Sequence, residues 1–419
     1  MIDHRQFLKS LFDAAVAAAD PSHGIAHYLP KPPQNGRTVV IGAGKGSAQM
    51  AAALEKIWQG ELSGVVVTRY GYGCQTQHID VLEAAHPVPD EAGLKASERL
   101  KAAISELNAS DLVIALISGG GSALLPAPPD GCSLADEVAV NEALLRSGAP
   151  ISAMNVVRKH ASTIKGGRLA ALTKAKVISL IMSDIPGDEP SLVASGPTVP
   201  DASTREDALK IIQQYRIKLP EPILKHIQSE AAKAPHPDDD RFSANETYIV
   251  GSAAVSLKAA ADVARTHGVT PIILSDAIEG EAREIAKMHG AIARQISKFD
   301  EPFKKPVVLL SGGETTVTVR NSHGRGGRNG EFALSLASEL DGLSVSALSA
   351  DTDGIDGTEN NAGAFVDGTT IKRMRDLGVD PNKLLSENLS YEAFLASNDL
   401  LVTGPTGVNV NDFRAIIIT

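Results

Sequence analysis

The sequence is poor in aromatic side chains and in cysteine. Phe, Trp and Tyr make up 4% of the 419 residues, and the two cysteines are Cys74 and Cys132. They form no CxxC pair and have no metal-ligand spacing, which excludes a disulfide framework and a cysteine-based zinc site. Two isolated cysteines are typical of a protein in a reducing compartment.

Long apolar runs and excess positive charge are also lacking. No apolar run reaches the roughly 18 residues that a membrane-spanning helix needs. The formal net charge of −10 argues against nonspecific binding to nucleic acid or to an anionic membrane. Charged residues interrupt the N-terminal segment, so it is not a secretory signal, and its apolar residues from Phe7 to Val16 recur at helical spacing. We therefore expect a soluble cytoplasmic enzyme with neither a nucleic-acid nor a membrane partner.

Short apolar runs alternate with helical segments in the N-terminal half of the chain. Strands are predicted at 38–44, 64–68, 111–120 and 177–184, and a helix typical of the intervening segments is predicted at 90–107. This alternation is typical of βαβ units around a parallel sheet that helices cover on both faces. The predicted fold class is therefore α/β.

A change of composition at 231–242, AAKAPHPDDDRF, predicts a connection between two domains. The expected domains are residues 1–235 and residues 240–419. The segments 315–319 and 413–419 look like strands without crossover helices, so a mixed sheet is expected in the second domain. Similar strand–glycine–helix turns occur in both halves, which leaves an internal duplication open.

The segment 38–49, TVVIGAGKGSAQ, predicts a strand, a tight glycine turn and the start of a helix. It does not match the dinucleotide fingerprint, because its third glycine is misplaced and Arg69, not an acid, ends the next strand. It does not match the P-loop either, which requires a glycine at Val39. Backbone N–H groups around Gly44, together with Lys45, could bind a phosphate, or the turn is structural and the lysine merely exposed.

Two further glycine loops follow apolar strands, SGGGS at 118–122 and SGGE at 311–314. Consecutive glycines can turn their amides into one concavity that binds an anion. The residues of these glycine loops that we predict to bind phosphate or substrate are Gly44, Ser118, Gly119, Gly120, Gly121, Ser122, Gly312, Gly313 and Glu314.

A polar face is predicted on a helix within 152–172. Helical spacing places Asn155, Arg158 and Lys165 on that face. Clustered positive charge could bind a carboxylate or a phosphate there. An ordinary solvated helix face is the alternative interpretation.

Carboxylates and arginines supply the remaining candidate chemistry. Asp184 ends a predicted strand, where α/β sheets bind ligands. Asp351 and Asp353 lie in a glycine-rich acidic loop that does not have EF-hand spacing, and their hard oxygens suit Mg²⁺ bound together with nucleotide phosphates. Arg325 and Arg328 lie in a glycine-rich loop and could clamp a transferring phosphoryl group, or they are surface charges.

Nine motifs in order together resemble the glycerate 2-kinase family, whose C-terminal part is called the MOFRL domain. The resemblance runs from about residue 38 to residue 412. The motifs are VVIGAGKGSAQMAAALE, HPVPDEAGLKAS, LISGGGSALL, NVVRKHASTIKGGRLA, MSDIPGDEPSLVASGPT, LSGGETTVTV, GRGGRNGEFAL, DTDGIDGTENNAGAF and TGPTGVNVND.

The resemblance implies transfer of the ATP γ-phosphate to the 2-hydroxyl of D-glycerate, giving 2-phosphoglycerate and ADP, with a divalent metal. It implies a Rossmann-like N-terminal domain, a smaller α/β C-terminal domain and a site in the cleft between them. Matched position by position, it assigns Lys45, Asp184 and Arg325 as the catalytic group. D-glycerate and ATP are the implied partners, Mg²⁺ is the expected metal, and a homodimer is left open.

We expect Lys45 and Arg325 to neutralise charge on the γ-phosphoryl oxygens, and Asp184 to orient or deprotonate the attacking hydroxyl. The SGGG loop would bind phosphate or the substrate carboxylate. Members of the family have also been named hydroxypyruvate reductases, so an NAD(P)H-dependent reductase is the main alternative. The missing acid after the second strand counts against it. A non-catalytic sensor of sugar acids would leave Lys45 and the arginine and acidic loops without a joint purpose.

Overall fold

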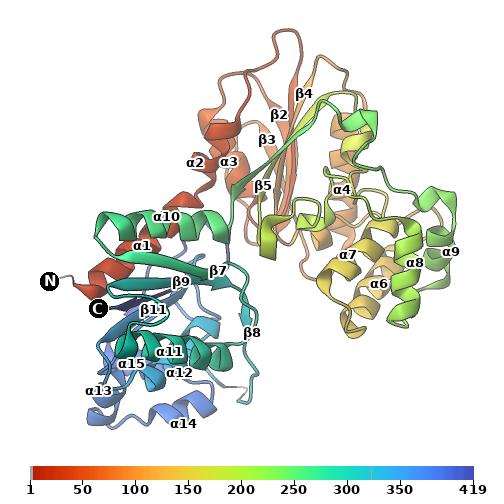
Figure 1. Cartoon of the computed structure of the whole chain (residues 1–419). Helices are drawn as coiled ribbons and strands as arrows, with labels where there is room; N and C mark the ends of the chain where they lie inside the picture. The colour runs from red at the N-terminus through yellow and green to blue at the C-terminus, as the bar shows by residue number, and fades with distance from the viewer. Residues whose placement is uncertain (1–2, 322) are drawn as a thin grey trace. The chain divides into compact units, whose positions relative to one another are not determined.

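The computed structural model describes residues 3–321 and 323–419, and it divides into two compact units (Figure 1). The first unit is Pro21–Val250, and the second is Gly251–Thr419 together with the N-terminal residues through Asp20. Within the described ranges, no helix is both long and apolar enough to cross a bilayer.

A six-stranded sheet with the order β3-β2-β1-β4-β5-β6 forms the centre of the first unit. The pairs β3–β2, β2–β1, β1–β4 and β4–β5 are parallel, which confirms the predicted parallel sheet. The strand order reverses between β1 and β4, which creates a topological switch point at their C-terminal ends. The strands are β1 Thr38–Ala43, β2 Ser63–Arg69, β3 Ile79–Ala84, β4 Leu112–Ser118, β5 Lys176–Met182 and β6 Glu246–Gly251.

Helices cover both faces of this sheet, with α3 and α4 on opposite sides of the strands (Figure 1). Every residue of β1 and of β4 is buried, as their continuous apolar runs predict. Helices α6 to α9 form a separate group with its own apolar core, which includes Leu144, Val157 and Ile223. The helices are α2 Pro21–Tyr28, α3 Ser47–Ile57, α4 Glu91–Ser105, α5 Gly121–Leu124, α6 Leu134–Arg146, α7 Ile151–His160, α8 Arg205–Gln214 and α9 Glu221–Gln228.

The second unit is built on a six-stranded sheet with the order β13-β12-β11-β14-β9-β7. Only β7 and β9 pair in parallel, and the other four pairings are antiparallel, which confirms the predicted mixed sheet. The short strands β8 and β10 form a separate parallel pair. The strands are β7 Thr270–Ser275, β8 Gly280–Glu281, β9 Val307–Gly313, β10 Thr315–Thr316, β11 Val345–Asp351, β12 Gly363–Asp367, β13 Leu400–Leu401 and β14 Asp412–Ile418.

Two helical layers enclose the sheet of the second unit. Along β9, Val308 packs in one apolar cluster with α1 and α10, whereas Leu309 packs in a second cluster with α11 and α12. Successive side chains of a strand point to opposite faces, so β9 contributes to both cores. The helices are α1 His4–Ala18, α10 Ala253–Thr266, α11 Ala282–Phe299, α12 Arg328–Leu340, α13 Thr370–Asp376, α14 Pro381–Ser386 and α15 Ser390–Ser397.

The two compact units differ from the predicted domains at two places. Helix α1 buries Phe7, Leu11 and Phe12 in a core of the second unit, although it begins the chain. Strand β6, which follows the predicted connection, lies beside β5 in the first sheet. Helical and strand periodicity show that each element has an apolar face, but they do not show which core receives it.

Candidate active site

The glycine loops after β1 and β4 are hydrogen-bonded directly to each other. The backbone N–H of Lys45 donates to the carbonyl of Gly119 at 2.8 Å, and that of Gly46 donates to Ser118 Oγ at 2.9 Å. Gly44 has a φ of +136°, and any side chain on it would overlap Ser118. A glycine is therefore required where the two loops meet at the switch point of the sheet.

The side chains of Lys45 and His86 meet over Gly120. A Cβ atom on Gly120 would lie 3.0 Å from Lys45 Cγ, 3.1 Å from Lys45 Cε and 3.1 Å from His86 Nε2. Within the described part of the chain, no carboxylate forms an ion pair with Lys45. Its ammonium group is therefore free to bind an anionic ligand.

The carboxylate of Asp184 contacts the loop after β4 at Gly119, one residue before Gly120. Asp184 follows β5, and its carboxylate fills the space that a side chain on Gly119 would need. Strands β4 and β5 are parallel neighbours, so their C-terminal ends bring these two residues together. The structure thus gathers Lys45, Asp184 and the SGGG loop at one edge of the first sheet.

A hydrogen-bonded chain connects three further predicted residues of the first unit, Ser122, Asn155 and Arg158. The hydroxyls of Ser122 and Ser195 are hydrogen-bonded, and Ser195 Oγ donates to Asn155 Oδ1 at 3.3 Å. Arg158 Nη1 donates to the same Asn155 oxygen at 3.1 Å, and its Nε donates to Asn141 at 3.0 Å. Asn155 is buried, so this chain fixes the end of the SGGGS loop against α7.

The prediction that Lys165 shares a helix face with Asn155 and Arg158 is wrong. Helix α7 ends at His160, and Lys165 lies in the irregular segment beyond it. There its Nζ pairs with Glu137 Oε1 at 2.6 Å, and the side chains are only 3% and 5% exposed. A buried pair of this kind is a structural contact, and Lys165 brings no free positive charge to the glycine loops.

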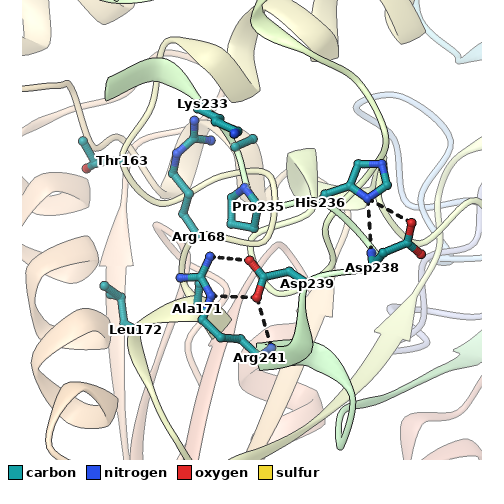
Figure 2. A pocket seen from close by; sticks show the side chains of 11 residues that line it. Thr163, Arg168, Ala171, Leu172, Lys233, Pro235, His236, Asp238, Asp239 and Arg241 are labelled. Carbon is teal, nitrogen blue, oxygen red and sulfur yellow. Dashed lines mark hydrogen bonds and ion pairs between the residues drawn. The ribbon is translucent and has the colours of Figure 1, made fainter. Parts of the chain in front are cut away.

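A pocket of about 690 Å³ elsewhere in the first unit is lined by none of the predicted site residues (Figure 2). Several of its charged side chains already have protein partners: Arg241 Nη2 contacts Asp239 Oδ2 at 2.7 Å, and Arg168 donates to the carbonyl of Ala232 at 2.7 Å. The size of this pocket therefore does not identify a chemical site.

In the second unit, Arg325 lies in the loop before α12 and is hydrogen-bonded to two glutamates. Its Nε and Nη2 atoms donate to Glu359 at 3.1 and 2.6 Å, and its Nη1 donates to Glu392 at 3.3 Å. Its guanidinium also lies 4.7 Å from the ring centroid of Tyr391. The side chain is 48% exposed, and the two carboxylates both fix the guanidinium and balance its charge.

Arg328, three residues later, is bound by three carboxylates. Its Nε donates to Asp412 at 2.6 Å, its Nη1 to Glu314 at 2.7 Å and its Nη2 to Asp351 at 2.8 Å. These charges raise the pKa of the Arg328 guanidinium although burial opposes the shift. Glu314 is thereby tied to the arginine loop, while Gly312 and Gly313 form the end of β9.

Comparison with known proteins places this architecture in a family. The model of DUF4147, a domain of unknown function, matches residues 7–228, and the model of the MOFRL family matches residues 307–412. A glycerate 2-kinase of Pyrococcus horikoshii is 39% identical, with 100% of this chain and 98% of the relative covered. The chain belongs to the glycerate 2-kinase family.

Two more relatives refine this assignment. The crystal structure of a glycerate kinase from Thermotoga maritima matches with a TM-score of 0.89 at 38% identity, covering 99% of both chains. A protein of Agrobacterium vitis that is provisionally named a hydroxypyruvate reductase is 51% identical, covering 100% of this chain and 95% of its own. Both names therefore occur among relatives of this glycerate 2-kinase family member.

The arrangement of the acidic loop that holds Asp351 and Asp353 does not suit a magnesium ion. Asp351 Oδ2 accepts from Arg328, its Oδ1 accepts from the N–H of Asp353, and Asp353 Oδ1 accepts from the N–H of Ile355. Burial raises the pKa of Asp351, which disfavours the charged form that a cation needs. Among described residues, no group of three His, Cys, Asp or Glu side chains could bind a metal. The structure therefore gives no support to metal ligation by Asp351 and Asp353.

Three residues that shape these sites were missed by the sequence predictions. His86 contacts Gly120 from the loop after β3, and Asp412 binds Arg328 from the start of β14. Asp356 is fully buried and accepts the N–H groups of Asn329 and Gly330 at 2.9 and 2.7 Å, which caps α12. His86 and Asp412 lie inside motifs quoted for the family resemblance, but only the folded chain shows their partners.

Proposed function

We propose that the chain transfers the γ-phosphoryl group of ATP to the 2-hydroxyl of D-glycerate, giving 2-phosphoglycerate and ADP. One observation carries the proposal: two bonded glycine loops, a carboxylate and a lysine ammonium that pairs with no described carboxylate are gathered at the switch point of a parallel sheet. Ligands bind at such switch points in α/β folds. Membership of the glycerate 2-kinase family supports the choice of substrates.

Phosphoryl transfer needs positioning and charge neutralisation more than covalent chemistry. Lys45 neutralises charge on the transferring oxygens, and the backbone N–H groups of the SGGG loop bind phosphate oxygens or the substrate carboxylate. Asp184 accepts a hydrogen bond from the 2-hydroxyl and takes its proton as the new P–O bond forms. The family resemblance assigns Arg325 as a second cation for the reaction; in this role its guanidinium exchanges its contacts with Glu359 and Glu392 for phosphoryl oxygens.

Magnesium would reach the protein with the nucleotide. Mg²⁺ is commonly bound through substrate phosphates and keeps several waters, so a complete set of protein ligands is not required. When bound, it would offset negative charge on the phosphate oxygens. This proposal assigns no step to Asp351 or Asp353.

A hydroxypyruvate reductase is the second candidate, because the 51%-identical relative carries that name provisionally. The structure offers one relevant residue, Arg69 at the end of β2, whose guanidinium lies 4.0 Å from the ring centroid of Tyr72. An acid at this strand end would suit the ribose of NAD, whereas an arginine suits the 2′-phosphate of NADP. NADPH must therefore be tested beside NADH.

The deciding assay gives the purified protein Mg-ATP and D-glycerate, then passes the product to enolase without a mutase. Enolase accepts 2-phosphoglycerate and not 3-phosphoglycerate, so phosphoenolpyruvate would support both the kinase and the 2-hydroxyl as acceptor. Formation of ADP without phosphoenolpyruvate would indicate that the phosphate is transferred to another hydroxyl. Oxidation of NADPH or NADH by hydroxypyruvate, with no ADP formed from ATP, would favour the reductase.

A further inference from the structure

His86 is placed to contact the ligand of the glycine loop. Its Nε2 atom lies 3.1 Å from the point where a Cβ of Gly120 would stand, and Lys45 Cε lies 3.1 Å from the same point. The imidazole nitrogen and the end of the lysine side chain therefore flank one position over the loop. Because Gly120 has no side chain, both groups can lie close to the loop, where a side chain on residue 120 would crowd them.

In the described part of the chain, no hydrogen-bond partner explains where the ring of His86 lies. Neither ring nitrogen forms a hydrogen bond with a described residue, although the residue is partly buried. By comparison, buried His160 and His289 each use both ring nitrogens in hydrogen bonds to protein groups. The ring nitrogens of His86 are not among the fully buried polar atoms that lack a partner, so a ligand can reach them.

The charge of the surroundings fits an anionic ligand. Burial and the cations Lys45 and Arg69 lower the pKa of His86 to about 4, so the imidazole is neutral near pH 7. A neutral imidazole donates a hydrogen bond from one nitrogen only. Next to the Lys45 ammonium, a ligand oxygen that carries negative charge is the favoured acceptor.

We propose that His86 is a substrate-contacting residue that donates a hydrogen bond from Nε2 to an oxygen of the phosphoryl group held by Lys45 and the SGGG loop. This inference rests on the proposed kinase function, because that function supplies the phosphoryl group. It adds to Lys45 a neutral donor whose direction is fixed by the ring, whereas the ammonium group of a lysine can rotate.

Inorganic phosphate tests the contact without relying on turnover. In a ¹⁵N-labelled sample, phosphate should shift the ring-nitrogen resonance of His86, which is assigned by its loss in His86→Gln. Calorimetry should show phosphate binding weakened by about 10- to 100-fold in His86→Ala, the range for a hydrogen bond to a charged group. His86→Gln keeps an N–H donor of similar reach and should stay within about threefold of wild type. The exposed His78→Ala is the matched control and should bind phosphate as wild type does.

Two results would overturn the proposal: no shift of the His86 resonance at any phosphate concentration, or equal phosphate affinity in wild type and a folded His86→Ala. Circular dichroism and thermal melting of each variant establish that it is folded. The kinase assay with D-glycerate is read separately. Wild type without kinase activity would reject the proposed function, while the phosphate titration would still decide whether His86 contacts an anion.

Discussion

The carboxylate of Asp184 occupies the space in which a side chain on Gly119 would stand. This contact joins the end of β5 to the loop after β4, and it fixes the carboxylate beside the backbone that we propose binds phosphate. The proposed proton acceptor and the anion-binding loop are therefore parts of one packed arrangement.

Gly119→Ala should displace the Asp184 carboxylate and lower kcat for D-glycerate phosphorylation by about 10- to 100-fold, because small misplacements of reacting groups are costly. Gly131→Ala is the control, because a methyl group on Gly131 would strike nothing, although the residue has a φ of +79°. It should lose about 1 kcal/mol of unfolding free energy and keep its kcat. Normal turnover in Gly119→Ala would show that the position of Asp184 is not critical.

We expect different roles for the two arginines near the start of α12: Arg325 in function and Arg328 in stability. Arg328→Met leaves buried Asp351 without its cation and leaves Asp412 paired with Arg414 alone, so the unfolding free energy should fall by about 3–5 kcal/mol. Arg325→Met removes a half-exposed pair and should cost about 1 kcal/mol or less, yet strongly reduce kcat. Urea unfolding and steady-state kinetics of both variants measure the difference. Equal losses of stability would contradict it.

We expect Lys165 to stabilise the fold and not to bind substrate. Lys165→Met leaves the buried carboxylate of Glu137 unpaired and should cost about 3–5 kcal/mol of unfolding free energy. At a temperature where the variant is folded, its KM for D-glycerate should equal that of wild type. A large increase in KM with unchanged stability would instead restore the substrate-binding role that the sequence predicts.

The pH dependence of the unfolding free energy should show a contribution from buried His289. Its ring is hydrogen-bonded to Ser311 Oγ and to the carbonyl of Ile285, and burial lowers its pKa to about 4 from 6.5. Between these values the unfolded state binds a proton that the folded state does not. The unfolding free energy should therefore decrease as the pH falls below 6.5, by about 1.4 kcal/mol per pH unit from this residue.

Urea unfolding of wild type and His289→Asn at pH 7 and pH 5 isolates this contribution, because the other titrating groups are shared. The variant should be less stable at pH 7 but lose less stability on acidification. Parallel losses in the two proteins would show that His289 titrates normally in the folded state.

Strands β1, β2, β4 and β5 of the first sheet could be predicted because they appear as apolar runs that are largely buried, whereas the outer strands β3 and β6 are only partly buried. The closeness of Asp184 to the SGGG loop also follows from sequence, since parallel neighbours end at the same edge of a sheet. Periodicity overextended α7, because the residues after His160 keep a helix-like pattern while Gly166 and Gly167 adopt positive φ.

Contacts between distant segments could not be predicted in this way. His86 and Lys45 lie on different loops, and nothing local in HPVPD indicates that the ring faces Gly120. Likewise, the sequence of the acidic loop suggests metal binding, whereas the structure shows Asp351 bonded to Arg328. Charge pairing across a fold depends on which strand ends meet, and residue spacing alone does not determine it.

The central claim is that Lys45 stabilises phosphoryl transfer to D-glycerate. The most direct measurement is kcat of Lys45→Met in the enolase-coupled assay, beside wild type and the exposed control Lys174→Met. We predict equal phosphoenolpyruvate formation by wild type and Lys174→Met, and a loss of about 10³-fold or more in a folded Lys45→Met. Near-normal turnover by Lys45→Met would contradict the account.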